Sequence, residues 1–130
     1  MEINVSNYQK KIKISKKWVK KVAISVLKKT GIKGELSIIL VDNKDIKKLN
    51  HKYRHKNRAT DVLSFSQEKE EKVACPLFLL GDVVISVERA KSQAREYGHT
   101  FKDEMRILIR HGILHLLGYT HKQMGKNEGD

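Results

Sequence analysis

The chain has 130 residues, of which 39% are hydrophobic and 32% are charged, and this predicts one folded domain over residues 1–130. The composition excludes a disordered or fibrous chain, and no apolar run approaches the roughly 20 residues that cross a bilayer. Lysine and arginine number 27 against 15 aspartates and glutamates, and the formal charge of +12 favours a polyanionic partner such as RNA.

The start of the chain and its cysteine content bear on cellular location. Residues 1–5 lack the basic segment and apolar stretch of a secretory signal, so we expect a cytoplasmic protein with no membrane partner. The single cysteine, Cys75, can form neither an internal disulfide nor a thiolate zinc cluster.

A strand, a helix and a second strand are predicted in the first third of the chain. Ile3 and Val5 alternate with polar residues, as in a short edge strand. Ser15 can cap a helix that ends at Gly31, because glycine tolerates the left-handed conformation. The apolar run over residues 35–41 then predicts a buried strand.

The first helix is both amphipathic and very basic. Its apolar side chains recur at helical spacing and predict a face that packs on the core: Trp18, Val19, Val22, Ala23, Val26 and Leu27. The remaining surface carries lysines: Lys16, Lys17, Lys20, Lys21, Lys28 and Lys29. Solvated lysines and lysines that contact RNA both fit this pattern. Binding to an anionic membrane is disfavoured, because core packing accounts for the apolar face.

A second helix and two further strands are predicted in the middle of the chain. Asp42 or Asn43 can cap the helix, and the polar residues 51–58 follow its end. One face of this helix is apolar: Ile46, Leu49 and Tyr53. Residues 61–66 and 78–86 are predicted strands, and a charged loop joins them.

Two helices complete the predicted fold. Ser86 can cap the first, which ends at Gly98, and Thr100 can cap the second, which runs to about Leu117 with Gly118 as its stop. The last helix is apolar on nearly every side and therefore belongs in the centre of the fold. Strands interleaved with helices predict an α+β domain, with a mixed, mostly parallel four-stranded sheet, a buried central helix and several surrounding helices.

Three histidines near the end of the chain have the spacing of metal ligands. His111 and His115 are four residues apart, so on a helix both rings can face one point, and a chain reversal at Gly118 lets His121 reach it. Three imidazoles leave one tetrahedral position open for water, as in catalytic zinc sites. We therefore expect one zinc ion per chain, with nickel or another transition metal as the alternative. The other histidines lack this spacing and are predicted to lie at the surface: His51, His55 and His99.

The segment that carries these histidines, HGILHLLGYTH over residues 111–121, resembles the HGxLHLxGYDH signature of the YbeY-type endoribonucleases. Residues 49–54 (LNHKYR), 60–65 (TDVLSF) and 80–86 (LGDVVIS) resemble other blocks of that family in the same order. The resemblance leaves out only the N-terminal third and the charged loop.

The resemblance implies a metal-dependent endoribonuclease that prefers single-stranded RNA. It implies a role in 16S ribosomal RNA 3′-end maturation and ribosome quality control, in association with the small ribosomal subunit. The residues that match its metal ligands are His111, His115 and His121. We expect Arg54 and His115 to be catalytic, and Arg54, Lys52 and Arg58 to contact the RNA, because a guanidinium can bind two phosphate oxygens and offset transition-state charge.

The chain departs from the family pattern at three positions. Thr120 stands where the family usually has aspartate, which removes a carboxylate beside the third histidine. Ala59 and Ser66 stand where prolines are usual, which affects loop stiffness more than chemistry.

The identity of the nucleophile stays open between a hydroxide formed from water on the metal and the 2′-hydroxyl group of the RNA. Asp61 and Asp82 are candidates for supporting roles only.

Two other functions fit parts of the pattern. A metallopeptidase also has two histidines four residues apart, but its motif places a glutamate base directly after the first one, where this chain has Gly112. A non-catalytic ribosome-assembly factor would use the metal site only to hold the helix end in place. Replacement of His115 separates this assembly factor from the endoribonuclease, because RNA binding would survive in both and only the enzyme would lose cleavage.

Overall fold

The computed structural model describes residues 2–32, 34–56, 60–66 and 79–118. Its elements are, in chain order, β1 (Glu2–Asn7), α1 (Lys16–Thr30), β2 (Glu35–Val41), α2 (Asn43–Arg54), β3 (Val62–Ser66), β4 (Leu79–Ser86), α3 (Val87–Tyr97) and α4 (Phe101–Leu116). Predictions for the charged loop, Arg58, Ala59, Cys75, Thr120 and His121 lie outside the described residues.

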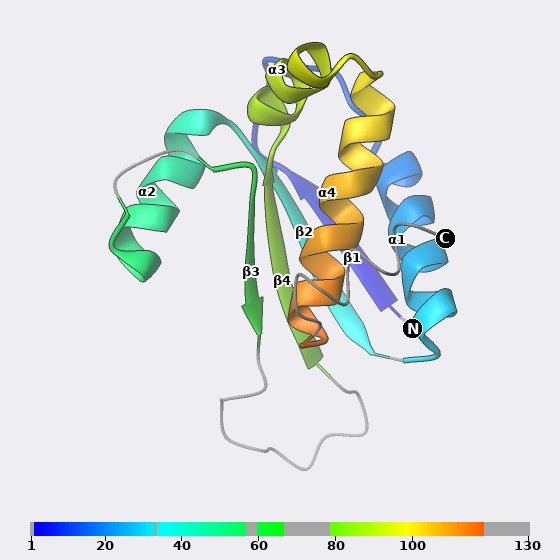
Figure 1. Ribbon diagram of the computed structural model, residues 1–130. Coiled ribbons are helices and arrows are strands. Elements are labelled where there is room, and N and C mark those ends of the chain that lie inside the picture. Colours follow the sequence, from blue (N-terminus) through cyan, green and yellow to red (C-terminus); the bar gives the residue numbers. More distant parts are fainter. Residues whose placement is uncertain (1, 33, 57–59, 67–78, 119–130) are drawn as a thin grey trace.

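The four strands form one mixed sheet in the order β1-β2-β4-β3 (Figure 1). β1, β2 and β4 are parallel, and β3 runs antiparallel to β4 at the edge of the sheet. Figure 1 shows α1 and α4 on one face of the sheet and α2 beside the other. This arrangement confirms the predicted α+β fold and its mostly parallel four-stranded sheet.

Side chains alternate in direction along each strand, so the sheet has an apolar layer on each face. The larger layer joins α1 and α4 to one face and contains Leu27, Ile85 and Ile109, all fully buried. The smaller layer joins α2 to the opposite face through Ile46 and Val84. Ile85 and Val84 are neighbours in β4 and point to opposite faces, as the pleat of a strand requires.

The predicted central helix, α4, packs against the sheet with eight buried residues: Glu104, Met105, Leu108, Ile109, Gly112, Ile113, Leu114 and Leu116. Its burial is not uniform, because Lys102, Arg106 and Ile107 face solvent. The Lys102 ammonium and the Arg106 guanidinium lie over the ring of Trp18 on α1, at 5.5 and 5.3 Å from its centre.

The predicted helix caps are present in the structure. The hydroxyl groups of Ser15, Ser86 and Thr100 accept hydrogen bonds from the backbone amide three residues further on, at 3.1–3.2 Å. Of the two candidates for α2, Asp42 is the cap, and its carboxylate accepts from the Asp45 amide at 2.9 Å. Local side-chain chemistry therefore fixes where these four helices begin.

The predicted end of α2 is wrong, because the helix continues through residues 51–54. Asn50 is buried and Tyr53 packs on Phe65 of β3, so the last turn retains contacts that hold it in the helix. Tyr53, on the predicted apolar face of this helix, is 55% exposed. The helix closes at His55, which adopts the left-handed conformation with φ of 57°. The longer helix carries Arg54 to the edge strand.

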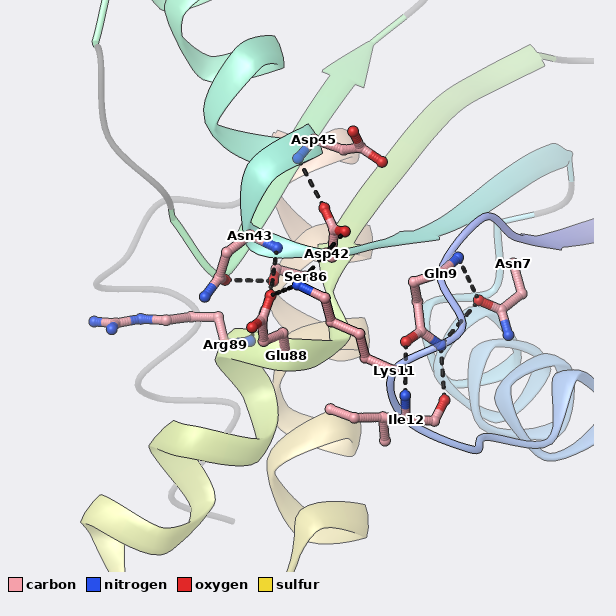
Figure 2. A network of polar contacts seen from close by, with 10 residues as sticks. All are labelled: Asn7, Gln9, Lys11, Ile12, Asp42, Asn43, Asp45, Ser86, Glu88 and Arg89. Carbon is pink, nitrogen blue, oxygen red and sulfur yellow. Dashed lines mark hydrogen bonds and ion pairs between the residues drawn. The ribbon is translucent and has the colours of Figure 1, made fainter.

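Figure 2 shows a polar network that joins the beginnings of α2 and α3 to the loop after β1. One carboxylate oxygen of Glu88 accepts from the Asn43 amide at 3.0 Å and from the Lys11 ammonium at 3.4 Å. The Ser86 hydroxyl donates to the Asn43 side chain at 2.7 Å. These contacts lie where the parallel strands end, a common ligand position in α/β sheets, and here they fix the start of α2.

None of the helices in the described ranges is long and apolar enough to span a membrane.

Candidate active site

A pocket of about 370 Å³ lies beside the edge strand β3. It is lined by residues from α2, α4, β3 and the residue before β3: Arg54, Asp61, Val62, Ser64, His111, His115 and Leu116. Three segments that the resemblance singled out separately therefore meet at one place. The fold brings the predicted arginine and two of the three predicted histidines together.

The two described histidines both line this pocket from one side of α4. His111 is half-buried and His115 is exposed, one helical turn further on. The next turn of the chain begins as predicted, because Gly118 has φ of 85° and its amide donates to the His115 carbonyl at 3.0 Å. Among the residues that the structure describes, no three His, Cys, Asp or Glu side chains form a metal cluster. Two imidazoles on one pocket wall fit two ligands of a transition metal, and the third predicted ligand lies outside the described residues.

Gly112, between the two histidines, lies directly against the sheet. A Cβ atom on this residue would lie 2.4 Å from Cγ1 of Val83 and 3.1 Å from Cγ2 of Val62. A glycine is therefore required for the close approach of α4 to β3 and β4. A glutamate at this position would occupy the space of the Val83 side chain, so the helix has no room for the base of the metallopeptidase motif.

Ser64 of β3 links the histidine helix to the arginine. Its hydroxyl donates to the Gly112 carbonyl at 2.9 Å, and its own carbonyl accepts from Nη2 of Arg54 at 3.2 Å. One strand residue thus holds the backbone between the two histidines and orients an exposed guanidinium toward the same pocket. Sequence reasoning missed this residue, because a serine in a strand has no distinctive pattern.

Asp61 is the carboxylate that lines the pocket in the described part of the chain. One of its oxygens accepts from the Val62 amide at 2.8 Å, and the other accepts from the Gln93 side chain at 3.3 Å. The Gln93 amide nitrogen also donates to buried Glu104 at 2.8 Å. The other oxygen of Glu104 lies 2.5 Å from Nε2 of His99. A polar chain through α3 and α4 therefore fixes the orientation of Asp61.

This row of hydrogen-bonded side chains shows that one prediction was wrong and contains residues that sequence reasoning missed. His99 is not a free surface residue, because its ring is bonded to Glu104, whereas His51 and His55 are exposed as predicted. Gln93 and Glu104 were missed, and the available signal was their place on the apolar faces of two helices. Glu104 lies one turn before Leu108, which is buried in the core.

Two further predicted residues in the described ranges, Lys52 and Asp82, do not line this pocket. Lys52 is exposed on α2, with its ammonium 5.2 Å from the centre of the Tyr53 ring, and it does not line the pocket. Asp82 is next to Val83 in β4, so the pleat directs its side chain to the face away from α4. The structure therefore separates the roles of the two aspartates and keeps only Asp61 beside the histidines.

Comparison with known proteins shows the family to which the chain belongs. The family model described as endoribonuclease YbeY matches residues 4–129. An endoribonuclease YbeY from Syntrophomonas wolfei is 42% identical over 133 residues, covering 94% of this chain and 85% of the relative. One from Aquifex aeolicus is 44% identical over 120 residues, covering 92% and 78%. A solution structure of a Thermotoga maritima protein, 31% identical, superposes with a TM-score of 0.63 over 92% of this chain and 74% of that one. The chain belongs to the endoribonuclease YbeY family.

Proposed function

We propose that this protein is a metal-dependent endoribonuclease that cleaves single-stranded RNA in the pocket beside β3. The observation that carries the proposal is that Arg54, His111 and His115 line one pocket although they come from distant parts of the sequence. Membership of a family whose relatives are named endoribonucleases supports the reaction type. The formal charge of +12 suits a polyanionic substrate.

In this proposal, His111, His115 and His121 hold one transition-metal ion, which we take to be zinc. A bound ion of this kind polarises a phosphoryl oxygen and lowers the pKa of water. Arg54, which lines the same pocket, binds the phosphate, and its hydrogen bond to the Ser64 carbonyl limits the positions of the guanidinium. Asp61 adds an oriented acceptor for a hydroxyl group of the substrate or a water molecule.

We also propose the biological substrate, which is the 3′ end of 16S ribosomal RNA on the small ribosomal subunit. This part of the proposal rests on the family resemblance and on the basic surface of the chain. Its direct test is the length of the 16S 3′ end in cells that lack the protein, which we expect to be extended.

The test of the reaction is cleavage of an end-labelled, single-stranded ribosomal RNA fragment. We expect the wild-type protein to cleave it, and His115→Ala and a chelated wild-type sample to lose cleavage while RNA binding persists. His55→Ala is the matched control, because His55 is exposed and does not line the pocket. Equal cleavage in every sample would indicate a contaminating nuclease. Binding without cleavage by the wild type would favour an assembly factor.

The chemistry of the product ends identifies the nucleophile in the same experiment. Products with 2′,3′-cyclic phosphate indicate attack by the 2′-hydroxyl group of the RNA, whereas products with 5′-phosphate and 3′-hydroxyl ends indicate attack by water. Asp61→Asn then tests whether the pocket carboxylate takes part in either route, because the amide keeps the size of the side chain but accepts protons poorly.

A further inference from the structure

Tyr53 places an exposed aromatic ring directly beside the proposed phosphate-binding arginine. The tyrosine is 55% exposed and belongs to the last turn of α2, where it is adjacent in the chain to Arg54. Arg54 lines the pocket and Tyr53 does not, so the ring lies outside the pocket rather than within it. A strand of RNA whose phosphate contacts Arg54 therefore has an aromatic surface next to it.

The ring of Tyr53 packs against the neighbouring strand β3. It meets Phe65 edge to face, with 5.3 Å between ring centres and 66° between ring planes. Phe65 follows Ser64, whose carbonyl accepts the hydrogen bond from Arg54, so one strand positions both side chains. The exposed remainder of the ring is available to a ligand.

The surface around Tyr53 is strongly basic. Exposed cations on α2 and just after it are Lys44, Lys47, Lys48, Lys52, Arg54 and Lys56. Within the described residues, none of these cations forms an ion pair with a carboxylate. The ammonium of Lys52 lies over the Tyr53 ring at 5.2 Å, and its flexible stem lets it move to a phosphate when a base takes that place.

We propose that Tyr53 stacks on an unpaired base of single-stranded RNA while Arg54 holds the adjacent phosphate at the pocket. Proteins that bind single strands combine such aromatic platforms with cations along the backbone, and stacking tolerates any base because every base has a π-face. A base within a duplex is already stacked and paired, so Tyr53 selects for unpaired RNA. The inference rests on the proposed function and makes Tyr53 a positioning residue for it.

The test compares three tyrosines that are exposed in different places. Tyr53→Leu keeps an apolar contact with Phe65 and removes the ring, and Tyr53→Phe keeps the ring. Tyr8→Leu and Tyr97→Leu are matched controls, because those tyrosines are 70% and 62% exposed and do not line the pocket. The probe is a short single-stranded oligoribonucleotide that carries 2-aminopurine, whose fluorescence falls when the base stacks. Fluorescence is recorded on mixing, before cleavage proceeds.

We expect Tyr53→Leu to weaken binding by about 5- to 150-fold and to lose most of the fluorescence quenching, as for the loss of one aromatic–base stack. The KM for cleavage rises correspondingly, whereas Tyr53→Phe and both controls behave as the wild type does. A parallel urea titration separates a folding defect from a binding defect.

Two outcomes overturn the inference in different ways. If the wild-type protein cleaves RNA and Tyr53→Leu shows normal affinity and quenching, the stacking role is removed and the proposed function stays intact. A wild-type protein that neither binds nor cleaves the oligonucleotide would remove both.

Discussion

Replacement of Gly112 by alanine tests the close contact on which the site depends. The added Cβ would lie 2.4 Å from Cγ1 of Val83, whereas carbon atoms in contact lie about 3.5–4.0 Å apart, so α4 and β4 must separate by about 1 Å. Such overpacking costs about 1–3 kcal/mol, and the higher helix propensity of alanine offsets about 1 kcal/mol of it. We expect a net loss of roughly 0–2 kcal/mol in the free energy of unfolding.

The effect on activity is expected to be larger than the effect on stability. Gly112 lies between His111 and His115, and a displacement of about 1 Å at reacting groups can lower a rate by about 100-fold. Urea denaturation and initial rates of RNA cleavage measure the two quantities on the same samples. Val83→Ala removes the clashing methyl groups, so the double variant should recover part of both losses relative to the sum of the single variants. A Gly112→Ala protein that is more stable than the wild type and equally active would refute this reasoning.

Three further changes test other contacts. Ser64→Ala removes the hydroxyl that donates to the Gly112 carbonyl and should lower the free energy of unfolding, measured in urea, by about 1 kcal/mol. Ser92→Ala, at an exposed serine on α3, is the control and should change it by less than about 0.5 kcal/mol. Equal losses would contradict a special role for Ser64. Gln93→Ala removes the amide that donates to both Asp61 and buried Glu104 and should cost about 1–3 kcal/mol in the same assay, because one oxygen of Glu104 then loses its hydrogen bond inside the protein. An unchanged midpoint would show that water replaces the amide at no cost. Lys52→Gln should make the log–log dependence of single-stranded RNA affinity on salt shallower by about 0.7, measured by fluorescence anisotropy, and an unchanged slope would exclude a phosphate contact.

Most of the fold could be predicted because its determinants are local. Hydroxyl and carboxylate caps mark the beginnings of the helices, and short apolar runs mark the buried strands. The place of β4 between β2 and β3 was not predicted, because strand order depends on contacts between distant segments. The end of α2 was predicted too early for the same reason. Most of residues 51–54 are polar, and the contact of Tyr53 in this turn with Phe65 on another strand cannot be read from the local sequence.

The candidate site was predictable only where spacing or resemblance carried the signal. Helical geometry places His111 and His115 on one side of α4, and the structure finds both on one pocket wall. Arg54 by itself resembles any helix-end arginine, and only the family resemblance indicated its position. No role was predicted for Ser64 or Gln93, because their importance lies in hydrogen bonds to segments 48 and 32 residues away in the chain.

The packing of Gly112 also determines where a proton acceptor can lie in this site. Since α4 approaches β4 too closely for a side chain after His111, the histidine helix cannot carry its own carboxylate at that position. An acceptor must then come from another element, and in the described part of the chain the carboxylate that lines the pocket is Asp61, immediately before β3. Hydrogen bonds from the Val62 amide and the Gln93 side chain hold it independently of the histidines. The close helix–sheet contact therefore separates the groups that would hold a metal from the group that would handle a proton, and this separation distinguishes the site from a metallopeptidase site, where both stand on one helix.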